Sequence, residues 1–288
     1  MERVLLSIGH GFAAESAARA LGEGWRVLAT TRSPERVDGL ARVGREPVIW
    51  TPGEADGALV AALGQATHLI SSVPPDRGGD PVARALAPRI AEAGRLRWIG
   101  YLSATSVYGD AGGGWVDETT PPAPGSARGR ARLEAEGEWQ ALGASAGVAV
   151  AVLRIAGIYG PGRSAFDQLR RGTAHRIVKP GQVFSRIHVE DLGRIVAAAA
   201  GQEATGPFNL CDDEPAPPQD VVAFAADLAG LPCPPPVPFE AAELSEMARS
   251  FYGENKRTRS LRVGPELGVT LRHPDYRAGL RAILAAGG

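Results

Sequence analysis

The stretch RVLLSIGHGFAAESAARAL, residues 3–21, decides the fold class of this 288-residue chain. It opens with an apolar, strand-like run and closes with the apolar spacing of a helix. The turn between them has the pattern GxGxxA, in which glycines let the backbone approach a pyrophosphate and a small third residue allows close helix–strand packing. The helix N-terminus would face those phosphates. The stretch therefore predicts a dinucleotide site, although a tight turn without a ligand remains the alternative; its expected cofactor residues are Gly9, Gly11, Phe12, Ala13 and Ala14.

Strand-like and helix-like segments alternate through the first half of the chain. The strand-like runs are apolar and rich in β-branched residues: 25–30, 47–50, 67–73, 97–103 and 147–160. The helix-like runs between them lie at 33–43, 57–63, 81–93 and 126–136. Near-continuous apolar strands separated by helices are typical of a parallel sheet covered on both faces. We therefore predict an α/β fold with a Rossmann-type doubly wound parallel sheet.

The second half of the chain is less regular. A hairpin is expected around Pro180-Gly181, and a helix is expected to begin near Val189–Asp191. No internal repeat and no linker divides the chain into independent domains. We therefore expect one unit over residues 1–288, with a core at about 1–160 and an interleaved, small substrate-side lobe at about 161–288.

Composition excludes several classes of partner. Hydrophobic residues make up 44%, charged residues 22%, and the net charge is −1, so neither nucleic acid nor an anionic membrane is indicated. The cysteines Cys211 and Cys233 show no metal-ligand spacing, so no metal site is expected. No apolar run approaches the roughly 18 residues of a spanning helix, and the N-terminus lacks the pattern of a signal peptide. These features predict a cytoplasmic protein; a homo-oligomer is compatible with them.

The end of the second strand bears on the choice of cofactor. Sites that prefer NAD usually carry an acidic residue there, about 20 residues after the glycine turn, to bind the ribose 2′-hydroxyl. This chain has Thr31, Arg32 and Ser33 instead, and an arginine with two hydroxyls suits a 2′-phosphate. We therefore expect NADP, with NAD as the alternative. The fourth strand-like run ends in small residues, which are expected along the adenine ribose and pyrophosphate: Ser71, Ser72 and Val73.

The helix expected from residue 126 has charges that oppose its dipole. Ser126 is a suitable N-cap, yet the residues that follow include Arg128, Arg130 and Arg132. A helix N-terminus disfavours cations by a few tenths of a kcal/mol each. A bound anion would relieve this placement, and solvated arginines are the alternative. Arg130 lies on another face and is expected at the surface.

Motifs along nearly the whole chain carry a family resemblance. They are YLSATSVYGD (101–110), WVDETTPPAP (115–124), LRIAGIYGPGR (153–163), SRIHVEDLGR (185–194), FNLCDDEP (208–215) and ELGVTLRHPDYRAGL (266–280). In this order they resemble the extended short-chain dehydrogenase/reductase family, the NAD-dependent epimerase/dehydratase group. The turn GxGxxA, in place of the more usual GxxGxxG, is similar to the atypical branch of that family.

The resemblance implies an altered catalytic site. Family members use a Ser or Thr before the VYG segment and a Tyr–Lys pair spaced four apart on the next helix. Here Ala104 stands at the Ser/Thr position, flanked by Ser103 and Thr105, while Arg128 and Arg132 stand at the Tyr and Lys positions. A guanidinium stays protonated near pH 7, so Arg128 cannot exchange a proton as the tyrosine does. Both arginines can still clamp an anion, and Arg132 can donate to a ribose.

The remaining site expectations follow from the same resemblance. Catalytic candidates are Ser103, Thr105 and Tyr108, and Arg132 is expected at the cofactor. Expected substrate-binding residues are Arg128, Tyr159, Arg163 and Arg186. A strand is expected to turn into a helix near Val189–Asp191. At this junction, Asp191 is expected to be a cap or structural acceptor, and His188 is expected to be a buried partner.

The sequence thus predicts an atypical, NADP-dependent oxidoreductase or epimerase-like enzyme. Its expected substrate is small and anionic, and both a nucleotide-linked and a free compound fit this expectation. The alternative is a non-catalytic NADP-binding sensor or scaffold, which the loss of the family's Tyr–Lys pair favours.

Overall fold

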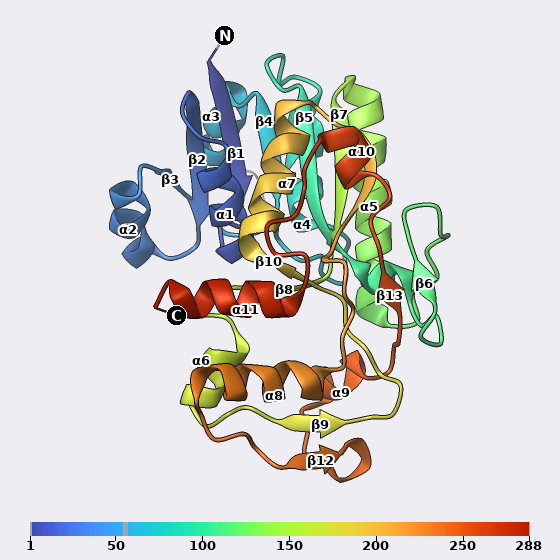
Figure 1. Ribbon diagram of the computed structural model, residues 1–288. Coiled ribbons are helices and arrows are strands. Elements are labelled where there is room, and N and C mark those ends of the chain that lie inside the picture. Colours follow the sequence, from blue (N-terminus) through green and yellow to red (C-terminus); the bar gives the residue numbers. More distant parts are fainter. Residues whose placement is uncertain (1, 54–56, 288) are drawn as a thin grey trace.

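A parallel sheet forms the centre of the molecule. The computed structural model describes residues 2–53 and 57–287, and within them seven parallel strands pair in the order β11-β7-β5-β4-β1-β2-β3 (Figure 1). These strands are β1 (Arg3–Ile8), β2 (Trp25–Thr31), β3 (Glu46–Ile49), β4 (His68–Ser71), β5 (Trp98–Ala104), β7 (Ala149–Ile155) and β11 (Gly206–Leu210). The reversal of strand order beside β1 is that of a doubly wound Rossmann sheet. The predicted fold class is confirmed.

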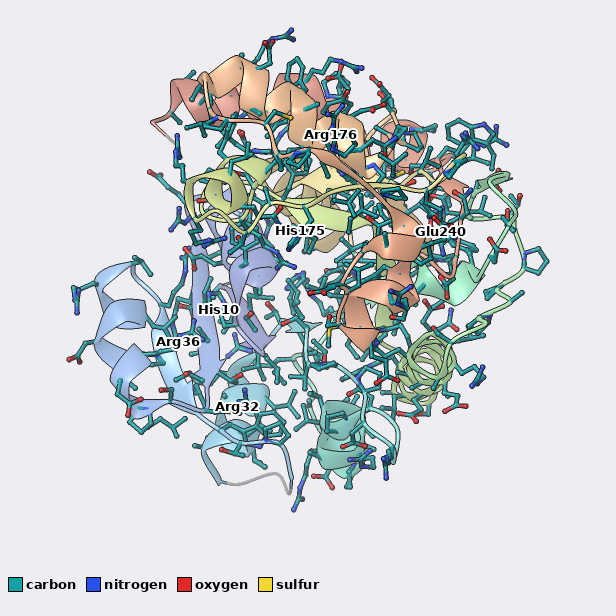
Figure 2. All side chains as sticks on the ribbon, turned by 90° about the horizontal axis from the view of Figure 1, so that it is seen from below. His10, Arg32, Arg36, His175, Arg176 and Glu240 are labelled. Carbon is teal, nitrogen blue, oxygen red and sulfur yellow. The ribbon has the colours of Figure 1, made fainter. Side chains whose placement is uncertain are left out.

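A smaller lobe lies below the carboxyl edge of this sheet in Figure 1. It contains β8 (Gly157–Tyr159), α6 (Ala165–Arg170), β9 (Arg176–Val178), β10 (Arg186–His188), α8 (Pro218–Ala229), β12 (Pro236–Pro238), η3 (Phe239–Ala241), α9 (Glu246–Phe251) and α11 (Tyr276–Ala285). Seen from below, His10, Arg32 and Arg36 belong to the sheet domain, whereas His175, Arg176 and Glu240 belong to this lobe (Figure 2).

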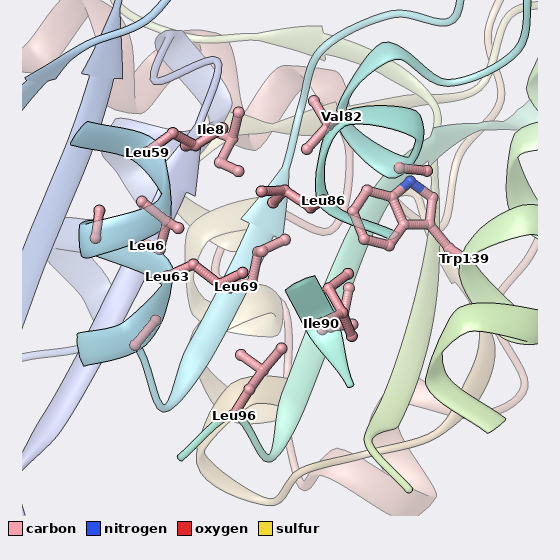
Figure 3. Packing of buried hydrophobic residues seen from close by; sticks show 14 of the residues in the cluster. Leu6, Ile8, Leu59, Leu63, Leu69, Val82, Leu86, Ile90, Leu96 and Trp139 are labelled. Atoms are coloured by element: carbon pink, nitrogen blue, oxygen red, sulfur yellow. The ribbon is translucent and has the colours of Figure 1, made fainter. Parts of the chain in front are cut away.

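Helices cover both faces of the sheet. One face carries α3 (Gly57–Gln65), α4 (Pro81–Ile90) and α5 (Ala127–Ala146); the other carries α1 (Phe12–Ala20), α7 (Val189–Gly201) and α10 (Val263–Leu267). Successive strand residues enter opposite clusters: Leu6 and Leu69 pack under α3 and α4 (Figure 3), while Leu5 and Ile70 pack under α1 and α7. Because both faces are buried, the strands read as continuous apolar runs.

Short elements connect these layers. They are η1 (Pro34–Arg36), α2 (Val37–Arg42), η2 (Thr105–Tyr108), and the two-residue strands β6 (Trp115–Val116) and β13 (Arg257–Thr258), which pair with each other. Among the described residues, no helix is both long and apolar enough to cross a bilayer.

The predicted hairpin around Pro180-Gly181 is wrong. β9 pairs in parallel with β12, and β10 pairs in parallel with β8, so the strands on either side of the turn do not meet. Between them, Gln182 donates to the Glu254 carbonyl at 2.9 Å, and the Phe184 N–H donates to the Ala216 carbonyl at 3.0 Å. These bonds to distant segments replace the local strand ladder. The helix predicted from Val189 is confirmed as α7.

The carboxyl ends of the central strands meet at one edge of the sheet. Gly9 follows β1, Thr31 ends β2, Ser71 ends β4, Ala104 ends β5 and Ile155 ends β7. Ligands of open α/β sheets bind outside this edge, at the point where the strand order reverses. The fold therefore gathers the residues singled out from the sequence along the boundary with the smaller lobe.

Candidate functional site

The two glycines of the turn have different surroundings. Gly9 has φ +76°, and a Cβ there would lie 2.8 Å from a methyl of Val73, so only glycine fits. Ser72 follows β4 and donates its hydroxyl to the Gly9 carbonyl. At Gly11 the opposite holds, since an added Cβ would have a single described atom within 4 Å, the Gly9 carbonyl oxygen at 3.7 Å. Open space therefore lies over the N-terminus of α1, where the sequence predicts a pyrophosphate.

His10, in the middle of the turn, is the buried centre of a hydrogen-bonded group. Its Nδ1 lies 2.8 Å from the Ser7 hydroxyl, and its Nε2 lies 2.8 Å from the Glu15 carboxylate. Burial lowers the pKa of His10. Burial raises the pKa of Glu15, but hydrogen bonds from Arg45, Arg19 and His10 outweigh it and hold that pKa at about 2. The turn thus rests on a neutral imidazole and a charged carboxylate.

Two arginines follow β2 in the chain: Arg32 comes directly after the strand, and Arg36 ends η1. Thr31 is buried, and its hydroxyl accepts the Ser33 N–H at 3.2 Å, which fixes the backbone on either side of the exposed Arg32. Arg36 donates from Nη2 to the His10 carbonyl at 3.1 Å. Figure 2 shows Arg32, Arg36 and His10 on the same part of the sheet domain. Arg36 was not predicted, because nothing in a local pattern indicates that η1 folds back toward the glycine turn.

Two predicted catalytic residues lie in a closed network behind this edge. The Ser103 hydroxyl donates to Glu136 at 2.5 Å, and Arg154 pairs with the same carboxylate at 2.8 Å. Tyr108 accepts from Arg154 at 3.0 Å and donates to Asn209 at 2.8 Å. All are buried, and burial raises the pKa of Tyr108. The arrangement joins β5, α5, β7 and β11.

Thr105 and Arg132 are placed differently. Thr105 begins η2 and is half-buried, and within the described chain its hydroxyl has no hydrogen-bond partner. Arg132 donates from Nη1 to the Tyr101 hydroxyl at 3.1 Å and to the Leu102 carbonyl at 3.0 Å, so its guanidinium lies against β5. A free hydroxyl and a fixed cation therefore flank the end of β5.

Arg128 contacts the smaller lobe. Its Nη2 donates to the Ser250 hydroxyl at 3.3 Å, and its guanidinium lies 5.3 Å from the centre of the Phe251 ring. Both partners belong to α9, so Arg128 joins α5 to the lobe across the site. Arg130 is exposed, and among the described residues its side chain donates only to the Gly125 carbonyl, which agrees with its expected surface position.

A cavity of about 390 Å³ brings together three of the predicted substrate-binding residues, Tyr159, Arg163 and Arg186. The Arg163 guanidinium lies 5.9 Å from the Phe12 ring at the start of α1, so the cavity borders the glycine turn. His175, which Figure 2 shows on the smaller lobe, also lines it.

Asp191 and His188 lie behind this cavity. Asp191 accepts the backbone N–H groups of Arg272 at 2.9 Å and His273 at 2.8 Å, so it is a structural acceptor, as expected. His188 is buried, and its Nδ1 accepts the Glu190 N–H at the start of α7. One ligand atom each from His188, Glu190 and His273 lie within 4.8 Å of one another, but Glu190 is already bonded to Arg272 and His273. Capping of α7 accounts for this group.

Asp212 is a buried carboxyl near Arg186. Its two oxygens have no hydrogen-bond partner among the described residues. Burial raises its pKa from 3.8 to about 8, and the opposing attraction of Arg186 does not offset this. The folded protein therefore holds this proton more tightly than the unfolded chain.

We expect Asp212→Asn to flatten the pH dependence of stability. Because the folded pKa is raised, wild-type stability falls as pH rises between 3.8 and about 8. Denaturant unfolding at pH 5 and pH 8 should show wild type losing about 1–3 kcal/mol more than the variant across this range. Equal losses in the two proteins would show that Asp212 titrates normally.

Known proteins resemble this chain over nearly its whole length. Residues 84–211 match the model of the NAD dependent epimerase/dehydratase family. A conserved protein of unknown function from Silicibacter pomeroyi is 50% identical, with 99% of both chains covered and a TM-score of 0.88. A 3-diazoavenalumate denitrifying reductase from Streptomyces is 29% identical over 95% of both chains. MoeE5, solved with UDP-glucose and NAD, is 22% identical over 98% of this chain and 97% of its own, with a TM-score of 0.79.

Proposed function

We propose that this chain, of which residues 84–211 match the model of the NAD dependent epimerase/dehydratase family, is an NADP-dependent oxidoreductase or epimerase-like enzyme with a small anionic substrate. The observation that carries the proposal is the open space at Gly11, over the N-terminus of α1 and beside two arginines. A helix N-terminus and a glycine backbone favour a pyrophosphate, and the arginines favour a further phosphate.

The proposed cofactor would lie along the carboxyl edge of the sheet. Gly9, Gly11 and the start of α1 would hold its pyrophosphate, with Ser72 and Val73 as the wall beyond. Arg32, Ser33 and Arg36 would hold the 2′-phosphate. The nicotinamide end would then reach β5, where Arg132 and Thr105 stand. When bound, the nicotinamide supplies or accepts a hydride.

The chain's own residues would orient the substrate for that transfer. Arg132 is held by Tyr101 and Leu102 and can donate to a ribose hydroxyl with its remaining N–H groups. Thr105 offers a hydroxyl that can donate to an oxygen or nitrogen of the substrate. Neither Arg128 nor Arg132 can act as a general acid near pH 7, so protons would come from hydroxyls or water.

The names of similar proteins support the proposed oxidoreductase activity. The Streptomyces relative is named as a reductase, and MoeE5 was solved with NAD and a nucleotide sugar. The alternative, a non-catalytic NADP sensor or scaffold, is favoured by one observation: Arg128, which the family resemblance places at the catalytic tyrosine position, is bonded to α9.

We expect Arg132→Gln to weaken NADPH binding by about tenfold, because one charge-assisted hydrogen bond contributes about 1.5–3 kcal/mol. The matched control is Arg130→Gln, two positions away and exposed, which should leave the affinity within about twofold. Fluorescence titration with NADPH measures both. Equal losses in the two variants would place Arg132 outside the cofactor site.

The function itself is tested by NADPH oxidation over a panel of small anionic carbonyl and nucleotide-sugar compounds. We expect turnover with at least one compound class in wild type and none in Gly11→Val. Tight NADPH binding with no turnover across the panel would favour the sensor. Restoring Tyr at 128 and Lys at 132 then asks whether the site still supports the family's chemistry.

A further inference from the structure

Arg186 is a cation without a counterion at the wall of the 390 Å³ cavity. Its side chain makes two hydrogen bonds within the described chain, both from Nη1, to the carbonyls of Phe184 at 2.8 Å and Ala216 at 3.0 Å. No acidic side chain of the described residues lies within ion-pair distance of it. Burial lowers the pKa of Arg186, and the neighbouring Asp212 is held in its neutral form by a raised pKa. A half-buried cation of this kind is stabilised by an anion.

Two tyrosines that line the same cavity, Tyr252 and Tyr276, also have hydroxyls that are unused within the described chain. The ring of Tyr252 packs edge-on against Phe184, with centroids 5.3 Å apart, and the ring of Tyr276 packs against Phe224 at 5.7 Å. These contacts fix the rings, yet neither hydroxyl has a hydrogen-bond partner in the part of the chain that the structure describes. The cavity thus offers two hydroxyl donors in addition to the unused N–H groups of Arg186.

One part of the cavity wall is apolar, and the space is small. This part is formed by Val221, Val222 and Leu280, together with Ile158 of β8. A volume of about 390 Å³ lies near the lower end of the range for small-molecule sites, roughly 300–1,000 Å³.

We propose that this cavity binds a compact organic monoanion, with its carboxylate on Arg186, Tyr252 and Tyr276 and an apolar, ring-sized body against Val221 and Leu280. The inference rests on the proposed function, since it names the substrate class of the same enzyme. Arginine presents a planar fork that matches a carboxylate bidentately. Arg163 and Arg171 add positive charge around the cavity and attract anions to it.

Isothermal titration calorimetry of the full chain with defined probes tests this assignment. The probes are cyclohexanecarboxylate, 4-hydroxybenzoate, acetate, phenyl phosphate and UMP, each titrated with and without NADP⁺. We expect the two ring carboxylates to bind at least tenfold more tightly than acetate and UMP. Acetate binding as tightly as the ring carboxylates would overturn the apolar body, and phenyl phosphate or UMP binding more tightly than both would overturn the carboxylate.

Variants locate the binding to this cavity. Arg186→Gln should weaken the ring carboxylates at least tenfold, and Tyr252→Phe, which keeps the ring, at least threefold. Arg170→Gln, on α6 and absent from the cavity wall, is the matched control and should change the affinity less than twofold. If Arg186→Gln fails to fold, the Tyr252→Phe variant still tests the proposal. Unchanged affinity of this variant for the ring carboxylates would contradict it. NADPH titration of every variant separates this result from the proposed function, which fails only if wild type does not bind the dinucleotide.

Discussion

Gly11→Val is expected to raise the dissociation constant for NADPH by about 1,000-fold or more while leaving the fold intact. A side chain at this position would place its Cβ no closer than 3.7 Å to any described atom beyond the adjacent residues, so the backbone leaves open space there. The same side chain would occupy the space in which the pyrophosphate approaches the backbone. Fluorescence titration measures the affinity, and thermal unfolding measures the fold.

The matched control for this change is Gly64→Val. Gly64 lies in α3, is exposed, and has no described atom beyond its own helix backbone within 4 Å of an added Cβ. We expect it to bind NADPH as wild type does. If folded Gly11→Val keeps its affinity for NADPH, the glycine turn is not part of the cofactor site.

Replacing Arg32 and Arg36 together by alanine is expected to weaken NADPH binding at least 100-fold and to leave NADH binding nearly unchanged. Each charge-assisted contact to a 2′-phosphate contributes about 1.5–3 kcal/mol. Only NADPH carries that phosphate, so the ratio of the two dissociation constants isolates the effect. The single variants Arg32→Ala and Arg36→Ala show how much of the loss of NADPH affinity comes from each arginine.

Arg42→Ala is the control for this pair, since it removes an exposed arginine from the end of the neighbouring α2. Its NADPH-to-NADH ratio should match that of wild type. A parallel loss of both cofactors in the double variant would show that the arginines support the turn, where Arg36 bonds to His10, and do not read the phosphate.

The fold followed from local pattern because the energetic causes are local. Strands buried on both faces have to be apolar throughout, and the two glycines of the turn have distinct steric reasons, a left-handed φ at Gly9 and open space at Gly11. The hairpin at Pro180-Gly181 was mispredicted because turn residues indicate a change of direction but not the pairing partner. That partner, β12 for β9, comes from a remote segment.

The site was less predictable than the fold because its contacts are long-range. Spacing places Arg128 on the helix, but only the folded chain shows that it meets Ser250 and Phe251 of α9. Likewise, Ser103 and Tyr108 carry hydroxyls of the right kind, and tertiary packing directs them to Glu136 and Asn209. No sequence pattern encodes such partners.

Calorimetric titration of the wild-type protein with NADPH and with NADH tests the proposed cofactor site. We expect saturable binding of one equivalent of NADPH per chain, at least tenfold tighter than NADH, because Arg32 and Arg36 would bind the 2′-phosphate. Absence of saturable binding for both dinucleotides would contradict the proposed site.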